Sequence, residues 1–166
     1  AIWMREIDPK SFKSISEPKM ILNGGINPEE TPIWIEGPHI YKVNGRYYLS
    51  AAEGGTERNH RQVILRSDSL WGPYVPGPRN PTLTQKDLPE DRPNPVTSTG
   101  HVDMFTDTLG NWWAVFLATR TYNGYHFNTG RETFLLPVEW KDGWPMILEP
   151  GKTVPYVGTL PWKAPY

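Results

Sequence analysis

Strand-like segments separated by tight turns recur along this chain of 166 residues. In the clearest pair, residues 39–43 and 46–52 flank Asn44-Gly45. A two-residue type I′ turn needs a positive φ at both central residues, and Asn-Gly adopts that conformation readily. Two further pairs are arranged in the same way, 101–107 with 112–119 around Leu109-Gly110 and 133–140 with 145–148 around Asp142-Gly143. The chain is therefore predicted to be built from antiparallel hairpins.

Helices are not expected. No segment of about 12 residues or more repeats its apolar positions with the roughly 3.6-residue period of an amphipathic helix. The 18 prolines and 15 glycines are scattered, so they punctuate short elements rather than form one linker. These features predict an all-β fold.

The hairpins also repeat. Gly45 and Gly110, like Tyr47 and Trp112, are separated by 65 residues. Each such hairpin is followed by a second, which begins near 63–66 in one copy and near 134–137 in the other. Two hairpins make a four-stranded sheet, and tandem four-stranded sheets are typical of β-propeller blades. A β-sandwich also has regular short strands, but it does not predict this internal similarity.

The repeat divides the chain into about two and a half blades within residues 1–150. The three parts are an outer half-blade at 1–32, a full blade at 33–80 and a second full blade at 95–150, with a proline-rich insertion over 78–94 expected to be a loop. Residues 151–166 have lost the repeat and are expected to be a closing strand or a linker. Because propellers typically need at least four blades, the other strands must come from another chain or a missing N-terminal segment.

Bulk properties exclude several classes of protein. The formal net charge of −1 gives no electrostatic case for a nucleic acid or an anionic membrane as partner. No apolar run approaches the roughly 20 residues of a membrane span. The chain has no cysteine, which excludes disulfides but leaves a cytoplasmic, periplasmic or secreted location open. It begins with Ala1 in strand-like sequence, so we expect a fragment or a processed chain of a soluble protein.

Glu36 is the leading candidate for chemistry. It follows Ile33, Trp34 and Ile35 at the start of a predicted strand. If these apolar residues shield the carboxyl group from water, its pKa should rise, because burial disfavours the charged form. A carboxylic acid that stays protonated near neutral pH can donate a proton to a leaving group, as glycosidic bond cleavage requires. The alternative is a structural glutamate paired with an Arg or Lys.

Four motifs together resemble glycoside hydrolase family 43, and within it the branch of β-xylosidases and α-L-arabinofuranosidases. They are Trp34 to Lys42 (WIEGPHIYK), Ala52 to Thr56 (AEGGT), Thr99 to Asp103 (TGHVD) and Gly130 to Trp140 (GRETFLLPVEW). They stand in order and cover nearly the whole chain. The resemblance implies a five-bladed β-propeller, of which this chain would be the C-terminal half.

In the family the anomeric carbon is inverted by three carboxylates around the propeller axis. The resemblance makes Glu36 the general acid and places the general base and a pKa-modulating Asp in the N-terminal half. An inverting mechanism needs the base roughly 6.5–9.5 Å from the acid. The chain alone is therefore expected to be inactive and to need a complementary N-terminal propeller fragment as partner.

The resemblance also implies substrate-binding roles for Arg131 and Thr56. The planar guanidinium of Arg131 could hold two sugar hydroxyls or a catalytic carboxylate, and the resemblance favours the sugar. The alternative is a structural ion pair with Glu132 or Glu139. The hydroxyl of Thr56 would contact the acid or the substrate, and the alternative is a turn hydroxyl bonded to its own backbone.

Trp34 and His101 complete the predicted site. The indole of Trp34 would stack on a sugar face. His101 stands where Pro38 stands one blade earlier, so we expect it in the central channel. In some family members the matching His binds a metal, often calcium, although calcium prefers oxygen ligands. No cofactor is required, and a calcium ion in the channel, with His101 as ligand, is the one metal implied.

Other candidates receive weaker assignments. Asn59 and His60 are placed at the rim of the sugar pocket, as is the loop 122–128. Glu53 and Asp103 are expected to be structural. Trp112 and Trp113 should face opposite sides of their sheet and pack between blades.

The sequence predicts an exo-acting, inverting glycosidase that releases xylose or arabinose, or both, from xylan-type, pentose-containing oligosaccharides. An endo-arabinanase with the same propeller and an open groove is the first alternative. A carbohydrate-binding propeller without catalysis is the second, because the base is absent. A C-terminal β-sandwich domain is a further expected partner.

Overall fold

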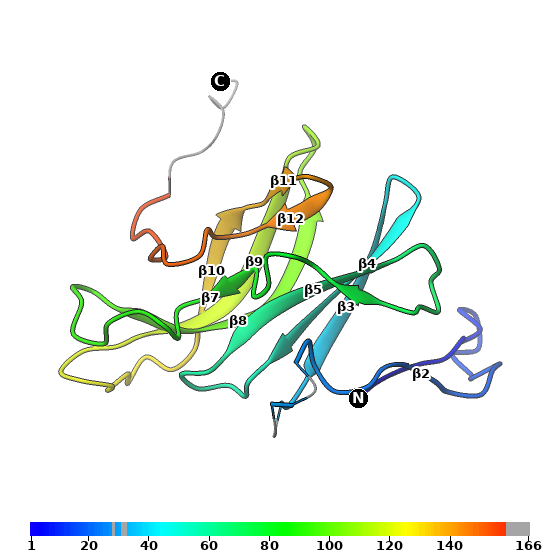
Figure 1. Cartoon of the computed structure of the whole chain (residues 1–166), viewed down its shortest axis with the longest axis horizontal. Helices are drawn as coiled ribbons and strands as arrows, with labels where there is room; N and C mark the ends of the chain where they lie inside the picture. Colours follow the sequence, from blue (N-terminus) through cyan, green and yellow to red (C-terminus); the bar gives the residue numbers. More distant parts are fainter. Residues whose placement is uncertain (28, 31–32, 159–166) are drawn as a thin grey trace.

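The computed structural model describes residues 1–27, 29–30 and 33–158 (Figure 1). Within these ranges the regular elements are strands, in four antiparallel sheets, and there is no helix. No helix that could cross a membrane is therefore found in the described part of the chain. The predicted all-β class is confirmed.

The first large sheet is the predicted blade that begins near residue 33. It contains β3 (Glu36–Val43), β4 (Arg46–Glu53) and β5 (Arg61–Ser67), with the short strands β6 (Val75–Pro76) and β7 (Leu83–Thr84) both paired to β5. Asn44 and Gly45 join β3 to β4 with φ values of 48° and 80°. The type I′ hairpin predicted from this dipeptide is confirmed.

The second large sheet contains β8 (Val96–Thr106), β9 (Trp112–Arg120) and β10 (Glu132–Pro137). Strands β11 (Glu139–Lys141) and β12 (Trp144–Met146) form a two-stranded sheet around Asp142-Gly143, which again has positive φ at both turn residues. The segment 133–140 was predicted as one strand, but it is interrupted at Val138, whose N–H donates a hydrogen bond to the carbonyl of Trp112.

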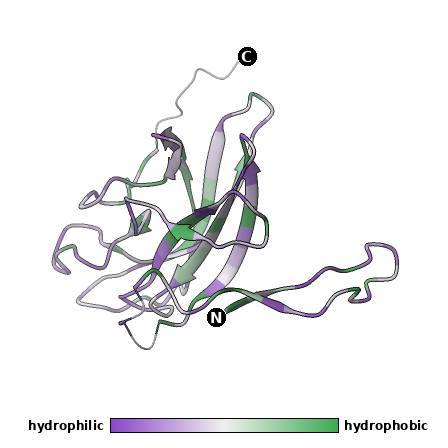
Figure 2. Cartoon of the chain, turned by 45° about the vertical axis from the view of Figure 1, so that its right-hand side comes forward, coloured by the Kyte–Doolittle hydropathy of each residue, from purple (hydrophilic) through white to green (hydrophobic). Residues whose placement is uncertain are grey.

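The N-terminal segment, predicted to be a half-blade, contains one hairpin. Strand β1 (Ile2–Met4) pairs with β2 (Lys19–Leu22), and the two form a separate sheet. The loop that joins the two strands extends away from the two large sheets (Figure 2).

The proline-rich insertion over 78–94 was expected to be a loop, but part of it is a strand. It contains β7, and Leu83 is fully buried. The side chain of Asn80 accepts a hydrogen bond from Ile64 N–H and donates one to the Ile64 carbonyl, each at 2.8 Å. These paired hydrogen bonds dock the insertion on the outer edge of β5, a tertiary contact that composition does not reveal.

Two apolar clusters hold the sheets together. The larger lies between the two large sheets and includes Ile64 and Leu83 from one and Met104, Phe116 and Leu136 from the other. The smaller joins β1 and β2 to β4 and β5. The sheets therefore pack face to face in sequence order, as consecutive propeller blades do.

Of the two adjacent tryptophans expected between blades, Trp112 lies at this interface. Trp112 packs against the larger cluster and makes edge contacts with Tyr41 and Trp140. Trp113 is 7% exposed, and its Nε1 donates a hydrogen bond to Asp107 at 3.1 Å. The two indoles thus point to opposite faces of β9, and Trp112 performs the predicted packing between blades.

The outward face of the second large sheet is partly uncovered in the described chain. Asp103 and Leu135 both pair with Val115, so these three side chains lie on one face of the sheet. Phe105 is two residues from Asp103 on the same strand and therefore shares this face, whereas the buried Met104 and Leu136 lie on the other. Phe105 is 44% exposed and Leu135 53% exposed. An exposed apolar sheet face of this kind is suited to packing against another blade.

After β12 the described chain has no further strand. The segment runs back beside the insertion, where Gln85 accepts a hydrogen bond from Val154 N–H and donates one to the Lys152 carbonyl. Residues 151–166 were predicted to be a closing strand or a linker. No strand forms over 151–158, and residues 159–166 lie outside the described residues.

Candidate active site

Glu36 is the first residue of β3 and pairs with Ala52 at the end of β4. The register shifts between Glu36 and His39, and Gly37 has a φ of 56°. This bulge re-aims the start of the strand. The side chain of Glu36 is half-buried and lines an open cleft of about 790 Å³.

Three chain segments form the cleft. The segment before β3 contributes Trp34, the β4–β5 loop contributes residues 54–59, and the β9–β10 loop contributes Tyr125. Thr56 and Asn59 are exposed in the β4–β5 loop and line the cleft. The structure therefore brings together Glu36, Trp34, Thr56 and Asn59, as the sequence predicted.

Trp34 does not shield Glu36 in the way that was expected. Its side chain is 61% exposed and its ring lies beside Gly55, where an added Cβ would be 3.2 Å from a ring carbon. Ile35 packs on the core cluster between the N-terminal hairpin and the first large sheet. Glu36 therefore faces an open cleft with an exposed indole at its edge, an arrangement suited to a sugar.

His101 lies beside the residue that follows Glu36. A Cβ added at Gly37 would be 2.7 Å from Cε1 of His101, so the imidazole packs directly on this glycine. His101 has a φ of 57° and sits next to the irregular register of β8 around Gly100. Its side chain is exposed.

His60 is not on the rim with Asn59, as was expected. Its side chain is 1% exposed, and its Nδ1 lies 3.0 Å from the carbonyl oxygen of Ser98. A carbonyl can only accept, so Nδ1 carries a proton. The ring also packs on Gly100, where a Cβ would be 2.7 Å away. Nε2 is buried and has no hydrogen-bond partner among the described residues.

The site's charged groups act on His60. Burial lowers the pKa of its imidazole, and the Ser98 carbonyl opposes that shift; His101 and Arg131 lower the pKa further and Glu36 raises it. These three side chains are therefore close enough to interact electrostatically with a buried, neutral histidine. Sequence reasoning missed this role because no local pattern shows that His60 is covered by β8.

Arg131 precedes β10 and is exposed. The two glutamates that were the alternative ion-pair partners of Arg131 pair with other residues. Glu132 pairs with Arg120, with an Nη2–Oε2 distance of 2.5 Å, and Glu139 pairs with Lys141. Among the described residues Arg131 has no ion pair of its own, which favours the predicted substrate-binding role.

Tyr125 and Arg58 are cleft residues that sequence reasoning did not single out. The hydroxyl of Tyr125 lies 2.6 Å from Oγ of Ser98, and the Arg58 guanidinium lies 4.1 Å from the centre of the Tyr125 ring. Arg58 also forms an ion pair with Glu90. The only sequence signal was the aromatic, polar loop 122–128, which was predicted as a rim.

Glu53 and Asp103 are held in structural contacts, as predicted. Glu53 is fully buried, and its Oε1 accepts a hydrogen bond from Nε of Arg61 at 2.9 Å, while Arg61 also binds Glu30 at 2.7 Å. Asp103 accepts a hydrogen bond from the hydroxyl of Tyr41 at 2.8 Å, which links the two large sheets.

The residues around His101 do not make a calcium site by themselves. No group of three or more His, Asp or Glu side chains that could hold a metal exists in the described part of the chain. Calcium takes several oxygen ligands, and a single imidazole does not supply them.

Comparison with known proteins defines the class. The family described as glycosyl hydrolases family 43 matches residues 1–145. The chain is 42% identical over 148 residues to the non-reducing end alpha-L-arabinofuranosidase of Bacteroides ovatus, covering 87% of this chain and 26% of that protein. It is 35% identical over 164 residues to a putative beta-xylosidase of Escherichia coli, covering 91% and 28%.

Solved structures agree. The GH43 BlXynB protein from Bacillus licheniformis matches with a TM-score of 0.80 and 36% identity, over 98% of this chain and 31% of that one. A GH43_12 structure retrieved from capybara gut metagenome matches with a TM-score of 0.78 and 43% identity, over 87% and 26%. This chain belongs to glycoside hydrolase family 43. Its fold is part of the family's five-bladed β-propeller, and it spans 26% to 31% of the length of these relatives.

Proposed function

We propose that this chain is the C-terminal part of the catalytic propeller of an inverting glycoside hydrolase, which releases xylose, arabinose or both from xylan-type oligosaccharides. The observation that carries the proposal is the position of Glu36. Its half-buried carboxyl group lines an open cleft, with the exposed indole of Trp34 in the same wall. In a family 43 chain this arrangement supports a proton donor beside a sugar platform.

Each side chain of the site has a role in this proposal. Glu36 protonates the leaving-group oxygen as general acid. Trp34 stacks on a sugar ring, and Thr56 offers a hydroxyl at the cleft wall. Arg131, which has no ion pair among the described residues, holds sugar hydroxyls through its guanidinium fork. His101 packs on Gly37 and fixes the backbone next to the acid.

The pentose preference is supported by the relatives. One is named an arabinofuranosidase and another a putative beta-xylosidase. These names describe proteins about three to four times longer than this chain, of which 26% and 28% are covered. We extend the substrate class to this chain because Glu36 and Trp34 stand together at its cleft.

The general base is proposed to come from the N-terminal half of the propeller. A second carboxylate, Glu57, also lines the cleft, but it stands on the exposed β4–β5 loop. The uncovered face around Phe105 and Leu135 and the two-stranded N-terminal sheet are the surfaces on which that half would pack. No metal takes part in this mechanism, and a calcium ion near His101 would need oxygen ligands from the same N-terminal half.

The proposal is tested by comparing the chain alone with the assembled propeller, meaning the chain combined with the N-terminal half. Hydrolysis of an aryl β-xyloside and an aryl α-arabinofuranoside is followed by NMR, which reports the anomer released first. The proposal expects turnover with inversion in the assembled propeller and none in the chain alone. Retention of configuration, or full activity of the chain alone, would contradict it. Glu57→Gln in the assembled propeller should leave turnover largely intact.

The same assay addresses the two alternatives. Release of long oligosaccharides from arabinan, in place of single pentoses, would favour the endo-arabinanase. Binding of oligosaccharides without any hydrolysis by the assembled propeller would favour the non-catalytic propeller. The exposed Trp34 is compatible with both, so product analysis is needed to decide.

A further inference from the structure

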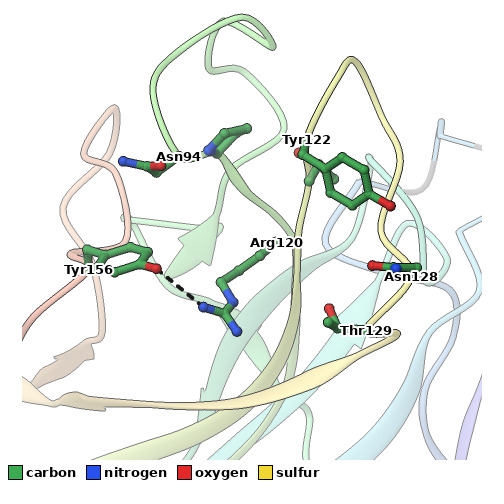
Figure 3. A pocket seen from close by; sticks show the side chains of 8 residues that line it. Asn94, Arg120, Tyr122, Asn128, Thr129 and Tyr156 are labelled. Atoms are coloured by element: carbon green, nitrogen blue, oxygen red, sulfur yellow. Dashed lines mark hydrogen bonds between the residues drawn. The ribbon is translucent and has the colours of Figure 1, made fainter.

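A second hollow lies at the same end of the sheets as the cleft. It has a volume of about 230 Å³ and is formed where β9 ends, with side chains on both sides of Arg120 (Figure 3). Its lining residues are Asn94, Pro95, Arg120, Thr121, Tyr122, Asn128, Thr129 and Tyr156. None of them lines the cleft of Glu36. The β9–β10 loop separates the two hollows and contributes Tyr125 to one and Tyr122 to the other.

The floor of this pocket is a fixed and electrically balanced network. Arg120 donates hydrogen bonds from Nε and Nη2 to the carboxylate of Glu132, at 3.0 and 2.5 Å. Thr129 also donates a hydrogen bond to this carboxylate, at 3.0 Å, and Nη1 of Arg120 reaches the hydroxyl of Tyr156 at 3.4 Å. Because the cation is matched by an anion, the pocket does not select for a phosphate or a carboxylate.

The walls offer neutral polar groups and aromatic surface. The amides of Asn94 and Asn128 present donors and acceptors, and the rings of Tyr122 and Tyr156 are 47% and 69% exposed. Neutral hydroxyl-rich ligands need both kinds of surface, planar hydrogen-bonding groups for their hydroxyls and aromatic rings for their C–H faces. The volume is below the roughly 300–1,000 Å³ of pockets that enclose a drug-sized ligand. It therefore suits one small ring.

We propose that this pocket is a second binding site for a neutral sugar unit of the polysaccharide on which the cleft acts. The ligand class rests on the proposed function, whereas the site itself rests on the pocket's geometry and charge. Two sites at one end of the propeller hold a polymer at two points, so the local concentration of chain ends at the cleft rises. A short aryl glycoside reaches only the cleft and gains nothing from the second site.

The experiment uses the assembled propeller with Glu36→Gln, which prevents hydrolysis, and xylotriose as probe in a calorimetric titration. The proposal expects two binding events. Asn94→Gly with Asn128→Ala should weaken one of them about tenfold, because two hydrogen-bonding side chains are lost. Glycine is chosen at Asn94 because its φ is 48°. Trp34→Ala should weaken the other event.

Asn123→Gly is the matched control. Asn123 lies in the β9–β10 loop with Asn128 and, like Asn94, has a positive φ, of 44°, but it does not line the pocket. A titration in which the pocket variant behaves like this control would overturn the proposal, as would a single event that disappears with Trp34→Ala. Failure of the proposed function is a separate result: no hydrolysis by the wild-type assembled propeller, with the pocket event retained, would support the pocket and reject the glycosidase.

Discussion

The imidazole of His101 rests on the α-carbon of Gly37, the residue next to Glu36. An added Cβ at Gly37 would lie 2.7 to 3.0 Å from three atoms of the ring. Gly37 also has a φ of 56°, which residues with a side chain rarely adopt. The backbone that carries Glu36 and the side chain of His101 are thus in close contact, and a residue without a Cβ is needed between them.

Gly37→Ala is therefore expected to displace either His101 or the start of β3. We predict a loss of turnover of roughly 100-fold in the assembled propeller, because a shift of about 1 Å in a positioned catalytic group can have that effect. Steady-state kinetics with an aryl xyloside provide the measurement. Gly110→Ala is the control, since Gly110 has a φ of 83° but nothing within 4 Å of an added Cβ. Equal losses in both variants would mean that backbone strain alone is responsible.

His60 should make stability depend on pH. Burial lowers the pKa of its imidazole below the ordinary 6.5. Below about pH 6.5 the unfolded chain binds a proton at this histidine that the folded chain does not. The free energy of unfolding therefore falls as the pH is lowered from about 6.5 toward the folded-state pKa. Above pH 6.5 the contribution of His60 to stability is complete. The slope from this one group is at most about 1.4 kcal/mol per pH unit.

His60→Asn tests that origin of the slope. Asparagine can still donate a hydrogen bond to the Ser98 carbonyl but does not titrate. Denaturant unfolding of the assembled propeller between pH 5 and 8 should show a flatter profile for the variant. An unchanged profile would assign the pH dependence to other groups.

The buried pair of Glu53 and Arg61 should behave as a unit. Both side chains are nearly inaccessible, and Arg61 also binds Glu30. Arg61→Met leaves the Glu53 carboxylate buried without its partner and should lower the free energy of unfolding by about 3–5 kcal/mol. Adding Glu53→Gln should restore part of this loss in a double-mutant cycle measured by urea unfolding. Strictly additive effects would contradict the coupling.

Leu135 is predicted to contact the N-terminal half of the propeller. Its side chain is 53% exposed on the uncovered face of the second large sheet. Leu135→Asp should weaken association of the separately produced halves by at least about tenfold, since a charge would be buried without a partner. Sedimentation or calorimetry of the two halves measures the effect. Leu109→Asp is the control, because Leu109 is 62% exposed at a hairpin turn. Equal weakening by both would argue against this face as the interface.

Local rules were sufficient where short-range chemistry decides the structure. Asn44-Gly45 and Asp142-Gly143 form the predicted turns because positive φ is a property of those residues. Glu36 could be singled out as the candidate acid because its neighbours form a motif. The repeat of the hairpins predicted blades, since consecutive sheets must bury their faces on each other.

The remaining features depend on contacts between segments distant in sequence. His60 is buried because Gly100 in β8 packs on its ring, 40 residues further along the chain. Strand β7 forms because Asn80 bonds to both backbone groups of Ile64. Tyr125 reaches the cleft through Ser98. No local periodicity encodes such contacts, so sequence reasoning placed these residues only in loops or on a rim.

The role of Glu36 as proton donor is tested most directly by Glu36→Gln in the assembled propeller, assayed with a series of aryl xylosides of graded leaving-group acidity. Leaving groups that depart readily need little protonation, so their turnover should fall by only a few-fold, whereas poor leaving groups should lose about 10²–10⁴-fold. A loss of the same size across the whole series would contradict a general acid at Glu36.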